Sequence, residues 1–382
     1  MVVLLRILHT YKIYRPDIEG GIPTVISCLI QNPEPGISNS ILVARRSGTA
    51  RSFTSDGVLV EAVASLGTVF SMPLAPGYIP AFVRSVRQAD VVVHHAPFPL
   101  TDAAILLGLP ASVALIVYWH ADIIGYPRLK RLMGSITRRV LARADKIVVS
   151  GATMIERSDA LKPYAEKCEV FPYGVDLAYW RTLDATEIQQ VERIRQQQPR
   201  HVVTVGRLVS YKGLEVLVRA MRDVDAKATI VGGGLLQEQL KRLAAELGVS
   251  NRIFFAGVIS RSEIKILFHA AQVFALPSVT DAEAFGIVQV EAMATGLPII
   301  NTRLCTTAPW VARHHQEALT VPPNDATALA QALNLVLDQP ALAQRLGASA
   351  YIRATEEFSD DIFRKRMGAV YYDAVRARVV QN

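Results

Sequence analysis

Short apolar segments alternate with segments of helical hydrophobic spacing along almost the whole 382-residue chain. The apolar segments are rich in Val, Ile and Leu and continuous, which is typical of parallel strands covered on both faces. The pattern predicts strands at 4–9, 41–44, 58–62, 90–95, 112–119, 146–150 and 170–175 in the first half, and at 201–205, 228–232, 252–256, 273–276 and 298–301 in the second.

Helical spacing is clearest in the second half, where it predicts helices at 212–222, 235–247, 261–270 and 286–295. Parallel strands that alternate with helices make a doubly wound α/β fold, and the length suits two such domains. A polar, Gln-rich segment at 182–200 separates the two strand series. We therefore expect one domain over 1–178 and a second over 179–382.

Composition narrows the class of protein. Half of the residues are hydrophobic (51%) and a fifth are charged (20%), which excludes a disordered chain. Three widely spaced cysteines exclude a disulfide framework and a cysteine-cluster metal site, and suit a reducing cytosol. The net charge of +7 favours an anionic partner, which could be a nucleotide, a nucleic acid or an acidic membrane surface.

Neither a signal peptide nor a membrane span is expected. Residues 1–10 lack the long apolar stretch and cleavage site of a signal peptide. The longest apolar run, 103–119, contains Gly108 and Pro110 and is shorter than a span of about 20 residues. We interpret it as a helix end followed by a buried strand, and a spanning helix is the weaker alternative.

Candidate chemistry follows the predicted strands, because ligands of open α/β sheets bind beyond the carboxyl ends of the strands. Arg207 follows the strand at 201–205, and Lys212 opens the next helix. The planar guanidinium of Arg207 and the ammonium group of Lys212 are therefore placed to bind a diphosphate. The cluster Gly232-Gly233-Gly234 follows the next strand. It suits close approach of a nucleotide and a tight turn equally well.

The segment 277–298 carries the sharpest pattern. Glu283 and Glu291 are eight residues apart, so on one helix they would differ by about 80° in azimuth. A helix that begins near Gly286 leaves Glu283 on a loop and points free N–H groups of Gly286 to Val288 at a diphosphate. Glu291 then lies deeper, within reach of a ribose hydroxyl pair. Two solvated surface acids are the alternative, which the apolar flanks disfavour.

This segment resembles the E-x7-E signature of retaining family 4 glycosyltransferases, which have the GT-B fold. The similarity extends along nearly the whole chain: Gly20-Gly21 resembles the family's glycine loop, His120-Ala121-Asp122 its cleft histidine motif, Tyr173-Gly174-Val175-Asp176 its N-G-V-D turn, Arg207 with Lys212 its phosphate pair, and 301–323 a subgroup rich in α-mannosyltransferases of surface polysaccharides. Tyr173 departs from the family, which often has Asn there. The fold implied is two Rossmann-like domains that face each other across a cleft, with a C-terminal helix at about 363–382 that packs back on the first.

The resemblance implies retaining transfer of a hexose from a nucleoside diphosphate sugar to a lipid-linked or polysaccharide acceptor in surface glycan biosynthesis. It favours mannose from GDP-mannose, with a UDP-hexose or UDP-N-acetylhexosamine as the alternative donor. By position, Arg207 and Lys212 would hold the diphosphate, and Glu291 would hold the ribose. Glu283, with the amides of Phe285 and Gly286, would hold the sugar and its phosphate, and His120 would contact the sugar. The donor site would be completed by Gly20, Gly21, Ile287 and Val288. The loop at 11–19 would serve acceptor choice. Whether Glu283 is a nucleophile or only positions the sugar stays open.

Other histidines and acids are expected to do less. His9, His94 and His95 also fall at strand ends, but neighbours on a strand point to opposite faces, so one of His94 and His95 is structural. Asp223-Val224-Asp225 imitates a metal-binding motif but precedes its strand, at the wrong end of a sheet. We therefore expect no metal and no other cofactor.

The segment 126–146 predicts a helix with an apolar stripe and one acid, Asp145, against seven cations: Arg128, Lys130, Arg131, Arg138, Arg139, Arg143 and Lys146. It predicts a cytoplasmic protein that contacts the anionic inner face of the cell membrane. A nucleic-acid-binding protein is a rival class, but the cations lack interleaved aromatics and no nucleic-acid motif is present. A nucleotide-sugar epimerase of the same fold is a second rival, and a non-catalytic binder, disfavoured by intact Glu283, His120 and Lys212, is a third.

Overall fold

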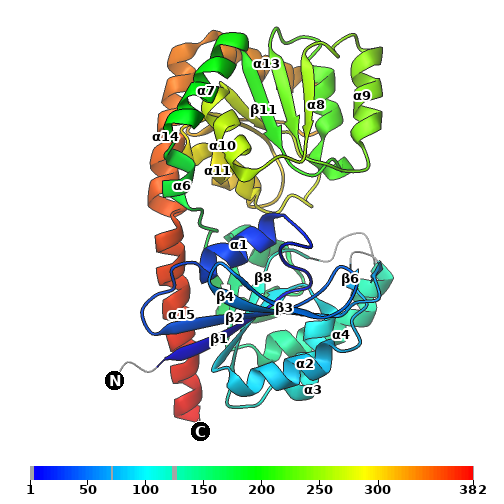
Figure 1. Ribbon diagram of the computed structural model, residues 1–382, viewed down its shortest axis with the longest axis vertical. Helices are drawn as coiled ribbons and strands as arrows, with labels where there is room; N and C mark the ends of the chain where they lie inside the picture. Colours follow the sequence, from blue (N-terminus) through cyan, green and yellow to red (C-terminus); the bar gives the residue numbers. More distant parts are fainter. Residues whose placement is uncertain (1–3, 70–71, 123–126, 382) are drawn as a thin grey trace. The chain divides into compact units, whose positions relative to one another are not determined.

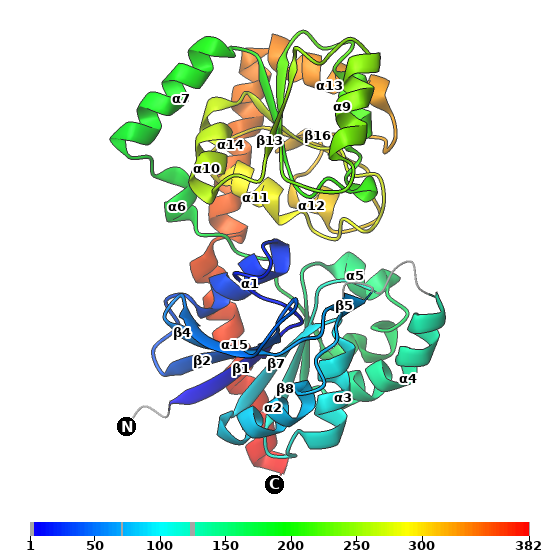
Figure 2. The same ribbon diagram turned by 45° about the vertical axis from the view of Figure 1, so that its right-hand side comes forward.

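The computed structural model describes residues 4–69, 72–122 and 127–381. The chain divides into two compact units (Figures 1 and 2). Unit 1 comprises residues 1–174 and 360–382, and unit 2 comprises residues 175–359. The boundary lies four residues before the predicted one, and the C-terminal helix α15 (Asp360–Gln381) belongs to unit 1.

Unit 1 contains an eight-stranded sheet of order β10-β9-β8-β7-β1-β2-β4-β3, in which only the β3–β4 pair is antiparallel. Its strands are β1 (Leu5–Thr10), β2 (Ile37–Ala44), β3 (Arg51–Ser55), β4 (Val58–Val63), β7 (Val91–Ala96), β8 (Ala114–Trp119), β9 (Lys146–Val149) and β10 (Cys168–Val170), and a separate hairpin joins β5 (Thr68–Val69) to β6 (Met72–Pro73). Every residue of β7 and β8 is buried, which explains their continuous apolar pattern.

Helices cover both faces of this sheet. The helices α2 (Tyr78–Ser85), α3 (Pro99–Gly108) and α4 (Pro127–Arg143) lie on one face, and α1 (Gly21–Ile30) and α15 lie on the other (Figure 2). The short helix α5 (Ala152–Arg157) and two 3-10 turns, Val86–Gln88 and Lys162–Lys167, complete the unit. The chain leaves α3 at Gly108 and enters β8 at Ala114, so the apolar run at 103–119 is a helix and a strand, as predicted.

Unit 2 contains a six-stranded parallel sheet of order β13-β12-β11-β14-β15-β16. Its strands are β11 (His201–Val205), β12 (Lys227–Val231), β13 (Ile253–Gly257), β14 (Val273–Leu276), β15 (Ile299–Thr302) and β16 (Ala318–Val321). Its helices are α6 (Leu177–Arg181), α7 (Ala185–Gln197), α8 (Leu214–Ala220), α9 (Gln237–Glu246), α10 (Arg261–Ala270), α11 (Ile287–Ala294), α12 (Ala308–Val311), α13 (Ala326–Asp338) and α14 (Pro340–Glu357), with a 3-10 turn at Ser210–Lys212. Figure 1 shows α8, α9 and α13 on one face and α10 and α11 on the other.

Three sequence predictions need correction. The strand predicted at 170–175 is instead β10, which ends at Val170, because Pro172 cannot donate to a ladder and the chain leaves the sheet there. The helix predicted at 126–146 ends at Arg143, and Lys146 begins β9. The strands β3, β5, β6 and β16 were not predicted, because their short, mixed sequences lack a continuous apolar run.

A buried ion pair joins α7 to α10. Glu187 completes the capping box of α7 with Asp184, and its carboxylate lies 2.8 Å from Nζ of Lys265 and accepts from Oγ of Ser262 at 2.7 Å. The hydrogen bond from Lys265 is the main reason that the pKa of Glu187 falls to about 2. The carboxylate of Glu187 therefore caps the amino end of α7 and also binds α10.

This pair predicts an acid-dependent stability. The folded state lowers the pKa of Glu187, so the stabilisation is complete above about pH 4.5 and disappears as the pH falls toward 2. We expect Glu187→Gln to lower the melting temperature at pH 7, and the difference from wild type to shrink in acid. Thermal unfolding as a function of pH measures it. Glu192→Gln, at an exposed site on the same helix, is the control; a constant difference at every pH would contradict the assignment.

Candidate functional site

Four loops meet at the carboxyl edge of the unit 2 sheet, because they follow the neighbouring strands β12, β11, β14 and β15. Lys212 belongs to the loop after β11, and Glu283 to the loop after β14. Nζ of Lys212 lies 2.5 Å from Oε2 of Glu283, and both side chains are nearly buried. The structure thus brings together two of the predicted site residues that are 71 positions apart.

Glu283 is held by three segments. Its Oε2 also accepts a hydrogen bond from Oγ of Ser278 at 2.8 Å, and its main-chain carbonyl accepts from Oγ1 of Thr306 at 2.8 Å. Ser278 is fully buried, and its own carbonyl accepts from Oγ1 of Thr302 at 2.5 Å. The carboxylate therefore has a fixed position before any ligand binds. Sequence reasoning missed Ser278 and Thr306, although both lie within the two segments that it singled out.

Arg207 lies beside Lys212, and Tyr211 is between them. The guanidinium of Arg207 is exposed, and its Nη2 lies 3.3 Å from the hydroxyl of Tyr211. Both cations face the Tyr211 ring, at 6.0 Å for Arg207 and 5.5 Å for Lys212. Tyr211 was not predicted as a site residue, but its position, four residues after Arg207 and one before Lys212, is the signal that could have found it.

The helix α11 begins where the spacing of the two glutamates predicted. Gly286 is its N-cap with φ of 69°, a left-handed conformation that favours glycine. Glu283 lies on the loop before it, and Glu291 lies half-buried on the helix. Phe285 is buried against Phe358, while Ile287 and Val288 form the half-buried first turn, which contains no acid. The positive end of the helix dipole therefore lies next to Glu283 and Lys212.

The glycine cluster after β12 packs against the loop after β11. A Cβ atom at Gly232 would lie 2.0 Å from the carbonyl oxygen of Gly206, and one at Gly234 would lie 2.4 Å from that of Leu208. The main chains of the two loops are therefore in contact, and close packing alone requires glycine here. Of the two interpretations of this cluster, the structure supports the turn.

In unit 1, three histidines form a hydrogen-bonded series across the sheet, which we call the histidine chain: His9, His95 and His120. Nδ1 of His9 lies 3.1 Å from Nε2 of His95, and Nδ1 of His95 lies 2.8 Å from Nε2 of His120. Asn39 contacts His9 at one end (3.2 Å), and the hydroxyl of Tyr173 contacts Nδ1 of His120 at the other (2.6 Å). Asn39, His9 and His95 lie on β2, β1 and β7, and His120 lies just after β8. These four strands are adjacent in the sheet.

Burial keeps the histidine chain uncharged. It lowers the pKa of His9 to about 4 and that of His120 to about 3, and it lowers the pKa of His95 well below its usual value. His120 is only 3% exposed and uses both ring nitrogens inside the protein. Both ring nitrogens are therefore already bonded within unit 1, and the ring anchors the chain at residues 120–122. His94 points to the other face of β7, as predicted, and its Nε2 lies 2.8 Å from Asp102.

The glycine pair of unit 1 opens α1. Gly20 is the N-cap and Gly21 the first residue of this helix. No described atom lies within 4 Å of the position that a Cβ would take at Gly20, so there is open space around it. Arg15 ties the preceding loop to the helix through Oγ of Ser27 (3.2 Å) and Oγ1 of Thr24 (3.4 Å).

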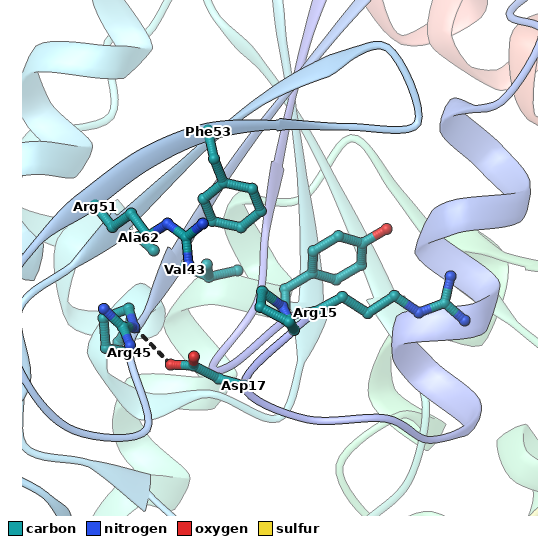
Figure 3. Close-up of a pocket in the computed structure, with 10 residues that line it drawn as sticks. Arg15, Asp17, Val43, Arg45, Arg51, Phe53 and Ala62 are labelled. Atoms are coloured by element: carbon teal, nitrogen blue, oxygen red, sulfur yellow. Dashed lines mark hydrogen bonds and ion pairs between the residues drawn. The ribbon is translucent and has the colours of Figure 1, made fainter. Parts of the chain in front are cut away.

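The loop at 11–19 also lines a small hollow (Figure 3). Asp17 accepts hydrogen bonds from Nε of Arg45 at 2.6 Å and from the main-chain N–H of Arg46 at 3.0 Å. Arg51, at the start of β3, lies over the ring of Phe53 at 5.0 Å. The loop expected to serve acceptor choice is thus fixed to the end of β2 by an ion pair.

The basic helix α4 is less free than its sequence predicted. Val140 and Leu141, two members of the apolar stripe, are buried in the core of unit 1. Arg143 donates to the carbonyls of Pro110 and Val113, and burial lowers its pKa. Lys146 pairs with Glu169 at 2.5 Å. Arg138 and Arg139 are exposed, whereas Tyr126 and the side chains of Arg128, Lys130 and Arg131 lie outside the described residues.

Two further observations concern metals and membranes. Within the described residues, no group of three or more His, Cys, Asp or Glu side chains is placed to hold a metal ion. The sequence Asp223-Val224-Asp225 lies just before β12, as expected for a turn. The helices in the described ranges include none that is both long and apolar enough to cross a membrane.

Two family models match the chain, one per strand series. The model described as "Glycosyl transferases group 1" matches residues 184–353, and the model described as "Glycosyl transferase 4-like domain" matches residues 33–174. A crystal structure titled Anabaena Alr3699/HepE in complex with UDP has the same fold, with a TM-score of 0.75 and 20% identity over 97% of this chain and 100% of that one. The fold is therefore GT-B.

Curated relatives match at higher identity. The D-rhamnosyltransferase WbpZ of Pseudomonas aeruginosa is 30% identical over 93% of this chain and 92% of its own. The O-antigen chain mannosyltransferase C of Escherichia coli is 28% identical (94% and 95%), and a GDP-mannose-dependent alpha-(1-6)-phosphatidylinositol monomannoside mannosyltransferase of Mycobacterium tuberculosis is 29% identical (76% and 79%). The chain belongs to the group 1 glycosyltransferases, and it is a hexosyltransferase that resembles mannosyltransferases.

The geometry of the unit 2 edge predicts how nucleotide binding responds to mutation. Arg207→Ala and Lys212→Ala should each weaken binding of a free nucleoside diphosphate by about 1.5–3 kcal/mol, because each removes a charge-assisted hydrogen bond. Isothermal titration calorimetry with GDP and UDP measures the loss. Arg219→Ala, which removes an exposed cation in the last turn of α8, is the matched control. Unchanged nucleotide affinity in both site variants would show that the diphosphate does not bind at this edge of the sheet.

Proposed function

We propose that the protein transfers a mannosyl residue from GDP-mannose, with retention at the anomeric carbon, to a lipid-linked or polysaccharide acceptor in surface glycan biosynthesis. The observation that carries the proposal is the Lys212–Glu283 pair beside the amino end of α11. It combines a fixed cation, a fixed carboxylate and the amino end of a helix, which suit a diphosphate joined to a hexose.

The donor residues divide by chemistry. Arg207, Lys212 and the N–H groups of the α11 amino end (Phe285, Gly286, Ile287 and Val288) hold the diphosphate, which gains negative charge as the bond from the anomeric carbon to the phosphate oxygen breaks. Glu291 holds the ribose hydroxyls. Gly20 and Gly21 leave room for the donor on unit 1. No metal or other cofactor is assigned to the reaction.

Glu283 and His120 serve the transferred sugar. Two donors, Lys212 and Ser278, already bind one oxygen of Glu283, and such bonds reduce the nucleophilicity of a carboxylate. We therefore assign Glu283 to positioning the sugar, with the departing phosphate oxygen taking the acceptor proton on the same face. His120 acts by positioning residues 120–122, because both its ring nitrogens are bonded inside unit 1.

The relatives support the donor and acceptor classes. Two of them are named as mannosyltransferases, one of these as GDP-mannose-dependent and acting on a phosphatidylinositol mannoside, and the third as a rhamnosyltransferase. The similar structure that holds UDP keeps a UDP-hexose as the alternative donor. Incubation of the protein and membranes with radiolabelled GDP- and UDP-sugars tests the proposal. Label in the lipid or glycan fraction from GDP-mannose is expected; label from a UDP-sugar alone would replace the donor, and interconversion of free sugar nucleotides without an acceptor would indicate an epimerase.

We also propose that the enzyme works in the cytoplasm, on the anionic inner face of the cell membrane, where a lipid-linked acceptor is presented. The exposed cations of α4, Arg138 and Arg139, support this proposal together with the cation-rich sequence before them. Arg143 and Lys146 are excluded from the contact surface, because each already binds groups within unit 1.

Vesicle binding is therefore expected to depend on charge. Anionic vesicles should bind the protein at low salt and lose it as salt rises, because surface charges are screened over about 8 Å at physiological ionic strength. The double variant Arg138→Gln/Arg139→Gln should bind more weakly in a vesicle co-sedimentation assay. Lys241→Gln/Arg242→Gln, an adjacent exposed pair on α9, is the matched control. Equal binding by both double variants would contradict the membrane proposal and leave the transferase proposal intact.

A further inference from the structure

The histidine chain connects the interior of unit 1 to the hydroxyl of Tyr173. Four hydrogen bonds lead from Asn39 through three imidazoles to the hydroxyl of Tyr173, with distances of 3.2, 3.1, 2.8 and 2.6 Å. His9, His95 and His120 are 0–3% exposed, and Tyr173 is 6% exposed. A neutral imidazole has one donor and one acceptor nitrogen, so the direction of one bond determines the direction of the next.

The Asn39 end suggests one direction. As placed, Oδ1 of Asn39 lies 3.2 Å from Nε2 of His9 and can only accept, which puts the proton on Nε2 of His9; Nδ2 of Asn39 has no partner among the described residues, and an amide turned by 180° would reverse the order. Nδ1 of His9 must then accept from Nε2–H of His95. By the same rule, Nδ1 of His95 accepts from Nε2–H of His120, and Nδ1 of His120 is left as an acceptor that needs a donor.

The Tyr173 end supplies that donor. The 2.6 Å contact between the Tyr173 hydroxyl and Nδ1 of His120 is the shortest in the series, and hydrogen bonds donated by hydroxyl groups are shorter than those donated by N–H groups. Burial raises the pKa of Tyr173, so the phenol keeps its proton. Both ends of the chain therefore indicate the same order, with a proton on Nε2 of every ring.

The neighbouring groups are compatible with this order. Ser150 also forms a hydrogen bond with the Tyr173 hydroxyl, and a phenol oxygen that accepts from Ser150 can still donate to His120. His94 faces the other side of β7 and bonds Asp102. The ring of Tyr118 stacks on His120 at 4.6 Å between centroids, but its hydroxyl donates to the carbonyl of Phe171. The helix α15 contributes Tyr371 edge-on to His9, and Tyr11 lies edge-on to His95.

We propose that Tyr173 is a positioning residue for the transfer reaction: its hydroxyl donates to Nδ1 of His120 and so fixes one tautomer along the whole histidine chain. The inference rests on the role proposed above for residues 120–122. Without the hydroxyl, Nδ1 of His120 becomes a buried acceptor with no donor, and the ring must shift or change tautomer to recover one. Residues 120–122, which the ring anchors, then lose their fixed position.

The first test reads the tautomers directly. Nitrogen-15 NMR of the imidazoles in the full-length wild-type protein should place the proton of His9, His95 and His120 on Nε2. None of the three should titrate between about pH 6 and about pH 8, where an exposed histidine does. A proton on Nδ1 of His120, or titration of that ring in this range, overturns the proposal.

The second test separates positioning from folding. Tyr173→Phe should lower kcat by about tenfold, the cost of one unsatisfied buried acceptor, with little change in the donor KM. Tyr118→Phe is the matched control, because it also removes a buried tyrosine hydroxyl beside His120 but no bond to a histidine. It should keep the wild-type kcat and the wild-type tautomers.

Two results overturn the proposal: wild-type kcat in Tyr173→Phe, or equal losses of kcat in both variants. Failure of the wild-type protein to transfer from any donor would instead refute the proposed function. The NMR measurement would still decide the tautomers in that case, so the two failures are distinguishable.

Discussion

The adjacency of parallel strands is the constraint on which the whole arrangement depends. Strands β12, β11, β14 and β15 are neighbours in one sheet, so the loops that follow them meet at one edge although they span about a hundred residues of sequence. That edge supplies Lys212 from one loop and Glu283 from the next, at 2.5 Å. In unit 1 the same constraint aligns Asn39 and the three residues of the histidine chain, which lie on or just after four adjacent strands.

The clusters described above solve the problem of buried polar groups in two ways. Lys212 with Glu283, and Lys265 with Glu187, are buried charges that neutralise each other in pairs. The histidine chain consists of buried imidazoles that stay uncharged, so they satisfy one another without a counter-ion. A paired cation can still bind a diphosphate, whereas the uncharged histidine chain only fixes the geometry of the residues around it.

Much of the fold could be predicted because period and burial leave clear traces in the sequence. Buried strands such as β7 and β8 are continuous apolar runs, and the eight-residue spacing of Glu283 and Glu291 placed the start of α11. Contacts between distant segments could not be predicted in this way. The hydrogen bonds of Thr306 to Glu283, and of Tyr173 to His120, depend on strand order, which no local pattern specifies. Likewise, nothing local in α4 shows that Arg143 closes onto the Pro110 turn.

The loop after β12 contains Gly232-Gly233-Gly234 and contacts the loop after β11. This contact limits how the enzyme could be redesigned. Main chain meets main chain where Gly232 approaches Gly206 and where Gly234 approaches Leu208. No side chain separates the two loops at these points, so a Cβ atom at Gly232 or Gly234 would clash with a main-chain carbonyl oxygen. A redesign of this edge of unit 2 would therefore require both loops to be exchanged together.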